Sequence, residues 1–173
     1  MTPEEFQKKL KGLETEFKDL FQAAAPRIIG VVAVREFKKN FQDGGFFGER
    51  WKEVKRRSNP PEYKSKTITR GKQKGEVRKT AWMRRKILTG ATGDLGRSIK
   101  VKSASNGQVI IWTDPVKFTH SKEPYGRVHN EGLRAGRGAG FTMPQRQFIG
   151  DHPKLREAII TELDRKLHEI INK

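Results

Sequence analysis

Three glycines in the middle of the chain have the spacing of a phosphate-binding turn. Gly90, Gly93 and Gly96 lie in the stretch KILTGATGDLGRSIKV. In dinucleotide-binding enzymes such glycines follow a buried strand and open a helix whose N-terminus faces the pyrophosphate. Here basic residues precede the glycines, residues 98–103 alternate with the period of a strand, and Asp114 is the only acid near the position of the expected ribose ligand. We therefore interpret the glycines as turn residues, not as phosphate ligands.

The remaining residues capable of chemistry form no catalytic or metal-binding pattern. His120, His129, His152 and His168 are not spaced as metal ligands, and no serine lies in a G-x-S-x-G turn. No glycine-rich stretch continues into the Gly-Lys-Ser/Thr of a phosphate-binding loop, and no paired carboxylates are evident. The absence of cysteine excludes disulfides and thiolate metal sites. We predict a protein that is not an enzyme and that needs no cofactor or metal.

The composition indicates one modest, strongly basic domain over residues 1–173. Hydrophobic residues make up 34% of the 173 residues, and the net charge is +17. A positive field of this size attracts polyanions, usually nucleic acid, although it can also aid solubility or match an acidic protein. The longest apolar run, residues 28–34, is far shorter than the roughly 20 residues that span a bilayer, and the N-terminus lacks a signal pattern. We expect no membrane association.

Helices are predicted at both ends of the chain. Residues 4–24 show helical spacing of apolar side chains, and Thr2, Pro3 and Glu5 form the pattern of a capping box. A second helix is expected from Pro26 to about residue 40, although the β-branched run 28–34 is also compatible with a strand. Gly44 and Gly45 should end it. A final helix, capped by Asp151, should extend to about Ile171.

Aromatic residues and a hairpin supply the predicted interior of the molecule. Phe46, Phe47 and Trp51 are too apolar for a free loop, so we expect them to fold back onto the body. The Asn-Gly pair at 106–107 is a strong hairpin signal. It places Ser103 opposite Ile110 and Val101 opposite Trp112, and it makes the second strand apolar on both faces and therefore central. We expect Trp51 and Trp112 to lie in the core.

Residues 58–86 differ in composition from the rest of the chain. They hold ten Lys and Arg against two acids, and few apolar residues before position 81. Such a segment cannot bury enough surface to offset its ordering entropy, so we expect a mobile basic loop. It is then an arm that contacts DNA or becomes ordered at a subunit interface. The alternative is a solvated linker.

The region before the last helix is predicted to contain a helical turn, a loop and an extended segment. Residues 125–132 should form the turn, ended by Gly132. Residues 134–140 form a glycine-rich loop, and residues 143–150 read as extended. The predicted fold class is α+β: a small antiparallel sheet including a 98–113 hairpin, packed by N-terminal helices and a long C-terminal helix.

Four segments occur in order between about residues 37 and 172. They are F…GERW at 41–51, ILTG…GDLGRSI at 87–99, YGRVHNEG at 125–132 and MPQRQFIG at 143–150. Together they resemble the phage virion morphogenesis (tail-completion) proteins of Mu-like and P2-like tailed phages. Gly126 and Asn130 depart from that family's pattern, and residues 58–86 and 134–140 match none of its motifs.

The resemblance implies a virion assembly protein at the head–tail junction. It implies a homo-oligomeric ring, hexameric in such families, that completes or terminates the tail and contacts other neck and tail proteins. The alternative from composition is a basic protein that coats nucleic acid without reading its sequence.

Two sets of residues are candidates for these contacts. The first is a subunit interface, in which Arg146 could make a bidentate contact or be an ordinary surface arginine, and His129 has a capping or interface role. Its members are Phe46, Phe47, Arg97, His129, Arg146 and Phe148. The second set would face packaged DNA without reading its sequence. Its members are Lys64, Lys66, Arg70, Lys72, Lys74, Arg78 and Lys79.

Overall fold

The computed structural model confirms a mixed fold of helices and small antiparallel sheets. It describes residues 2–59, 66–78, 80–89, 92–105, 107–113, 125–136 and 140–172. The chain divides into two compact units. The first unit comprises Met1–Lys39, Ser98–Lys117 and Ile149–Lys173, and the second comprises Asn40–Arg97 and Phe118–Phe148.

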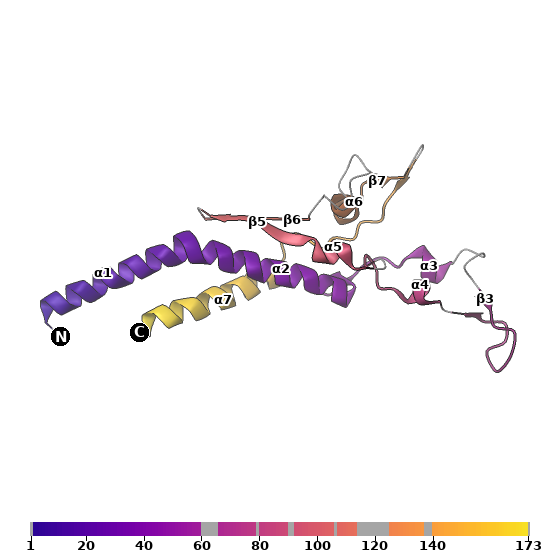
Figure 1. Cartoon of the computed structure of the whole chain (residues 1–173), viewed down its shortest axis with the longest axis horizontal. Coiled ribbons are helices and arrows are strands. Elements are labelled where there is room, and N and C mark those ends of the chain that lie inside the picture. The colour runs from indigo at the N-terminus through magenta and orange to yellow at the C-terminus, as the bar shows by residue number, and fades with distance from the viewer. Residues whose placement is uncertain are drawn as a thin grey trace. The chain divides into compact units, whose positions relative to one another are not determined.

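The N-terminal region is helical from Pro3 to Asp43 without a break (Figure 1). The capping box is confirmed, because the Thr2 hydroxyl accepts from the Glu5 N–H while the Glu5 carboxylate accepts from the Thr2 N–H. The strand alternative for residues 28–34 is excluded.

The expected boundary at Pro26 is replaced by a π-helical turn. Helix α1 (Pro3–Asp19) passes into η1 (Leu20–Ala24) and then into α2 (Ala25–Asp43). The Ala25 N–H bonds to the Leu20 carbonyl, five residues back. This wider turn lies immediately before Pro26, which has no N–H to contribute, so the helix continues where the sequence predicted a new start.

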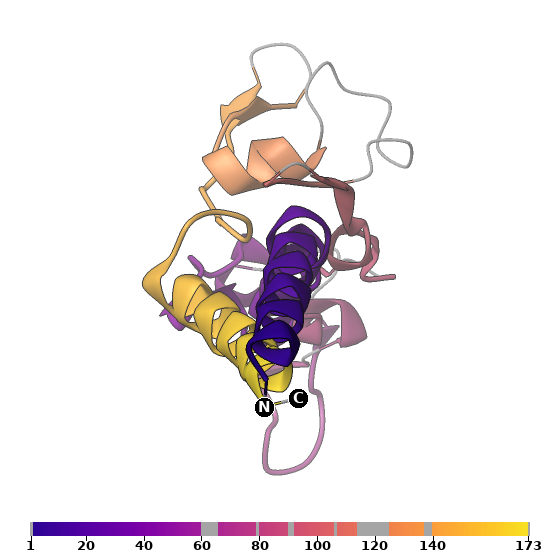
Figure 2. The ribbon, with the colours of Figure 1, turned by 90° about the vertical axis from the view of Figure 1, so that its left-hand side faces the viewer.

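Helix α7 (Pro153–Ile171) is the last element of the first unit and packs against α1, as Figures 1 and 2 show. The predicted cap at Asp151 is wrong by one residue. The His152 Nδ1 accepts from the Lys154 N–H at 3.1 Å, and the Asp151 carboxylate pairs with Arg156 instead. An imidazole nitrogen here fills the place usually taken by a short side-chain oxygen.

The hairpin of β5 (Ile99–Ser105) and β6 (Gln108–Thr113) contains a bulge that the sequence did not predict. Ser103 lies opposite Ile110 as expected, but the register shifts between Val101 and Ser103, so Val101 faces Ile111. Because one extra residue reverses the faces of a strand, Trp112 turns outward and is 37% exposed. Its predicted core position is therefore wrong.

The second strand of this hairpin is not central within the described residues. There β6 pairs with β5 alone, in a two-stranded sheet. The buried core of the first unit comes chiefly from the helices and the start of β5. Its buried apolar residues include Leu20, Val32, Phe37, Ile99 and Leu155.

Short elements connected by turns make up the second unit. In chain order they are β1 (Gly45–Phe46), β2 (Glu49–Arg50), α3 (Lys55–Ser58), β3 (Lys66–Thr67), β4 (Val77–Arg78), α4 (Ala81–Arg84), α5 (Asp94–Arg97), α6 (Tyr125–Glu131), β7 (Arg134–Ala135) and β8 (Phe141–Thr142). As predicted, Gly44 ends the helix before β1 with a positive φ of 73°, and Gly132 ends α6 with φ 72°. Residues 143–148 run without helix or strand.

Candidate interaction site

Aromatic residues from separate motifs pack together in the second unit. The Phe148 side chain is 1% exposed. Its ring centroid lies 5.1 Å from that of Phe41, which in turn lies 5.5 Å from that of Trp51 in an edge-on arrangement. Burying a phenylalanine contributes about 1.5–3 kcal/mol, and tilted or edge-on ring pairs add to this. The expected core position of Trp51 is confirmed.

Hydrogen bonds from side chains hold the main chain around these rings. The Asn40 amide donates to the Phe148 carbonyl at 3.2 Å and accepts from the Phe47 N–H at 3.0 Å. The Trp51 indole N–H donates to the Gln147 carbonyl at 2.7 Å. The Asn130 amide oxygen accepts from the Phe148 N–H at 2.9 Å. The extended segment before α7 therefore obtains from side chains part of the bonding that a sheet would otherwise supply.

Two motif glycines allow close packing in the same region. A Cβ on Gly96 would lie 3.2 Å from the Phe41 ring, and one on Gly132 would lie 3.0 Å from the Gln145 Cβ. Gly93 has φ 70° and precedes the single turn of α5, which agrees with our interpretation of it as a turn residue. Gly90 lies outside the described residues.

Arg146 lies in the interior of the second unit, with 5% of its surface exposed. Its backbone N–H donates to the His129 carbonyl at 2.8 Å, and its Nε donates to the Lys52 carbonyl at 3.1 Å. Burial, followed by the charge of Arg56, lowers the pKa of the Arg146 guanidinium. The alternative of an ordinary surface arginine is therefore excluded.

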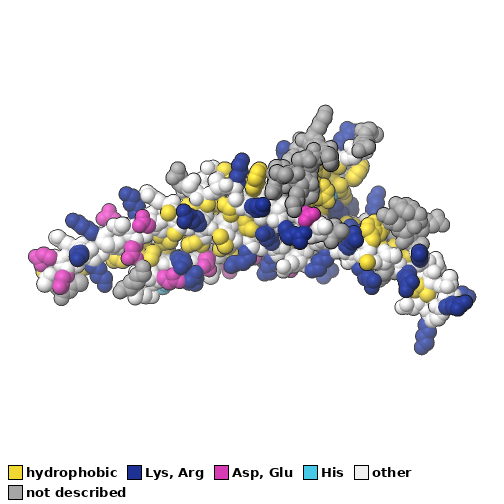
Figure 3. Space-filling view, in the orientation of Figure 1, with side chains coloured by type: hydrophobic (Ala, Val, Ile, Leu, Met, Phe, Trp, Pro, Cys, Tyr) yellow, Lys and Arg dark blue, Asp and Glu magenta, His cyan; other side chains and the backbone are white. Residues whose placement is uncertain are grey.

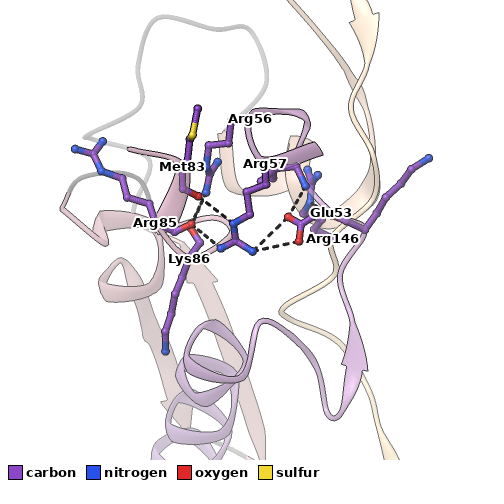
Figure 4. Close-up of polar contacts among 9 residues, drawn as sticks. Glu53, Arg56, Arg57, Met83, Arg85, Lys86 and Arg146 are labelled. Carbon is purple, nitrogen blue, oxygen red and sulfur yellow. Dashed lines mark hydrogen bonds and ion pairs between the residues drawn. The ribbon is translucent and has the colours of Figure 1, made fainter. Parts of the chain in front are cut away.

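Further arginines adjoin Arg146 (Figure 4). Arg57 donates to the carbonyls of Met83 and Arg85 and forms an ion pair with Glu53 at 3.2 Å. Arg56 donates through Nη2 to the carbonyls of Arg85 and Lys86, at 2.8 and 3.0 Å. We call Arg56, Arg57 and Arg146 the arginine centre.

His129 is buried beside the arginine centre. Its ring packs edge-on against Tyr125, with centroids 4.4 Å apart, and its Nδ1 has no hydrogen-bond partner in the part of the chain that the structure describes. Burial, and then the charge of Arg146, lower the pKa of His129 to about 4. The imidazole is therefore neutral at pH 7.

A model of the phage virion morphogenesis family matches residues 4–168 of the chain. The chain belongs to this family. No curated protein and no solved structure matches it. The family shows a role in phage virion assembly. Residues from the four motifs by which the sequence resembles it contact one another in the second unit, because Phe148 contacts Phe41 and Asn130, and Gly96 lies against Phe41.

The predicted interface residues of this virion morphogenesis protein have different surroundings. Phe46 is buried against the half-buried Phe47, with ring centroids 4.9 Å apart. Arg97 is exposed and pairs with Asp94 at 2.8 Å. Of the buried members, His129 and Arg146 lie at the arginine centre, whereas Phe148 packs among the aromatic rings. Contact with another subunit stays a prediction for all of them.

The predicted DNA-facing residues lie on and around a small hairpin of the family member. Strands β3 and β4 pair antiparallel, with Lys66 opposite Arg78. Lys66, Arg70, Lys72, Lys74 and Arg78 are all exposed, and Figure 3 shows basic side chains on the segment around β3. We call these five residues the basic hairpin. Lys64 and Lys79 lie outside the described residues, and the mobility of the segment stays a prediction.

Asn40 and Arg56 are functional candidates that sequence reasoning missed. Asn40 lies between two apolar positions of a helix, Phe37 and Phe41, and a polar residue on a buried face usually has a specific bonding role. No local pattern distinguishes Arg56 from the many other basic residues.

The described residues contain no cluster of three or more metal-ligating side chains. Among them there is also no helix that is long and apolar enough to cross a bilayer.

Proposed function

We propose that this chain is a subunit of a ring that completes or terminates the phage tail at the head–tail junction. The match to the virion morphogenesis family over residues 4–168 carries the proposal. The protein would be present in the host cytoplasm during assembly and in the neck of the finished virion. Its role would be structural and not catalytic.

The ring would be built from copies of this chain, hexameric by family resemblance, and would contact other neck and tail proteins. A ring subunit needs two different patches for head-to-tail contacts. The second unit offers both charged and apolar groups for them, including exposed Arg97 and half-buried Phe47.

Packaged DNA would pass through such a ring without being read. Phosphate contacts from lysine and arginine require no base recognition, and the exposed residues of the basic hairpin are suited to them. Sequence-independent contact with DNA is therefore part of this proposal.

The experiment is to measure the molar mass of the purified protein by light scattering, at low and high salt, with and without DNA. A discrete oligomer that forms without DNA and survives high salt is the expected result. Negative-stain electron microscopy of that oligomer should show a closed ring. A protein that remains monomeric even when purified phage tails are added would contradict the proposal.

The exposed basic hairpin also supports a second candidate function, coating of nucleic acid. That candidate predicts a monomer that assembles only on DNA and dissociates as the salt concentration rises. It also needs exposed aromatic side chains beside basic residues for stacking. Trp112, which is exposed and has the Lys102 ammonium 5.1 Å from its ring centroid, meets this need. Of the aromatics that the sequence suggests for stacking, Trp82 is half-buried, whereas Tyr63 and Phe118 lie outside the described residues.

A further inference from the structure

The arginine centre holds more positive charge than the described residues around it neutralise. The carboxylate beside it, that of Glu53, forms an ion pair with Arg57. Within the described part of the chain, Arg56 and Arg146 have only main-chain carbonyls as hydrogen-bond acceptors. A buried guanidinium that lacks an anionic partner is costly, so an anion from outside would stabilise this arrangement.

Several donors of the centre are unused. A guanidinium carries five N–H groups. Arg146 uses only Nε, which leaves both Nη groups without an acceptor among the described residues. The Arg56 Nε is buried and likewise unbonded there. The neighbouring Nδ1 of His129, buried and without a partner in the described chain, can serve as a further donor.

The shape of the centre favours a carboxylate over the phosphates of a DNA duplex. The paired Nη groups of an arginine match the two oxygens of a carboxylate. Since only 5% of the Arg146 surface is exposed, a single narrow side chain suits it better than the wide backbone of a duplex. Exposed cations such as those of the basic hairpin are the groups that suit DNA.

We propose that the arginine centre binds a carboxylate side chain of another protein chain, with the Nη groups of Arg146 as the fork and Arg56 beside it. The inference rests on the proposed function, because assembly brings other chains to this unit. To the proposed function the inference adds the class of ligand, a carboxylate, and the residues that bind this ligand. An acidic side chain of a second copy and one of a different assembly protein share this chemistry.

Titration with glutarate, a small dicarboxylate, tests the site directly. The arginine Nε–Hε resonances would be followed by NMR at constant ionic strength, at a protein concentration at which light scattering gives a monomer. We expect saturable shifts of the Arg146 signal. In Arg146→Lys, which keeps the charge and loses the fork, binding of glutarate should weaken by at least about tenfold.

Arg50→Lys is the matched control, because Arg50 is an exposed arginine of β2 in the same unit. It should bind glutarate like the wild type. The proposal is overturned if glutarate causes no saturable shift, if Arg146→Lys binds as tightly as the wild type, or if inorganic phosphate binds and glutarate does not. Should Arg146→Lys fail to fold, Arg56→Lys takes its place, with weaker glutarate binding expected.

Sedimentation velocity then identifies the source of the carboxylate. If a second copy supplies it, glutarate should dissociate the oligomer. If another assembly protein supplies it, the oligomer should persist while glutarate still binds. The two proposals can fail separately. A ring whose monomer shows no saturable glutarate binding overturns the site alone, whereas a permanent monomer that binds glutarate overturns the ring alone.

Discussion

Gly45 has no room for a side chain. A Cβ there would lie 2.3 Å from the Glu49 carbonyl oxygen, which belongs to the backbone of β2. Because backbone cannot move aside as a flexible side chain can, the turn would have to open. We expect Gly45→Ala to lower the free energy of unfolding by about 2–4 kcal/mol, as measured by urea denaturation.

Gly12 provides the control for that measurement. It lies in α1, and a Cβ added there would meet no atom within 4 Å among the described residues. Alanine forms helices better than glycine, so Gly12→Ala should raise the free energy of unfolding by about 0.5–1 kcal/mol. Equal effects of the two substitutions would contradict the clash at Gly45.

His129 should make the protein sensitive to acid. Its pKa is about 4 in the folded chain and about 6.5 in an unfolded one. Between these values the unfolded chain binds a proton that the folded chain does not, so stability falls as the pH drops from about 6.5 to about 4. The loss should approach about 3 kcal/mol once the pH is below both values.

Comparison with His129→Gln isolates this contribution. Urea denaturation between pH 7 and pH 4 should show a smaller loss of stability in the variant. Lowered carboxyl pKa values, such as that of Glu53, also cost stability on acidification, but both proteins share them. Parallel pH profiles for wild type and variant would contradict the assignment.

Single residues were predictable where their role is local. The Thr2 cap and the Gly132 helix end depend on neighbours within a few positions. The burial of Arg146 depends on Lys52 and His129, which are distant in sequence. No local pattern could place a charged side chain there, although the resemblance did mark Arg146 as a candidate.

At the scale of elements, Asn40 joins the end of α2 to the segment before α7. Its amide bonds to the Phe47 N–H and the Phe148 carbonyl. Asn40→Ala would remove both hydrogen bonds, so we expect a loss of about 2–5 kcal/mol in the free energy of unfolding, measured by urea denaturation. Asn172→Ala, at the exposed end of α7, is the control and should change it little.

In the β5–β6 hairpin, the positions of the strands were predictable and their full register was not. The Asn-Gly turn located both strands, and the pairing nearest the turn is correct. The bulge after Val101 was not predictable, because Ile110, Ile111 and Trp112 are all apolar and either face could be inward. A register shift of one residue then reversed the expected environment of Trp112.

At the scale of the molecule, the family resemblance indicated which distant segments belong together, and hydrophobic periodicity could not. Helix spacing predicted α1, α2 and α7, but it says nothing about which distant segments meet. The four motifs that resemble the virion morphogenesis family lie up to about a hundred residues apart. The structure brings residues of all four into the second unit. Motif order was therefore a better guide to the candidate site than composition.

The charge of the whole molecule leads to the last prediction, which concerns DNA. Five substitutions to glutamine would remove the charges of the basic hairpin, lowering the net charge from +17 by five. Each lost phosphate contact should reduce the slope of log affinity against log salt by about 0.9. We expect duplex affinity to fall at least about tenfold at moderate salt, as measured by fluorescence anisotropy.

A matched control separates the place of the charges from their number. It replaces the same number of exposed lysines in α1 and α2 by glutamine. These are Lys8, Lys9, Lys11, Lys18 and Lys38. If the basic hairpin contacts DNA directly, the control should retain most of the affinity and the wild-type salt slope, since long-range attraction alone is screened within about 10 Å at 0.1 M salt. Equal losses in the two variants would mean that the overall field, and not the hairpin, attracts DNA.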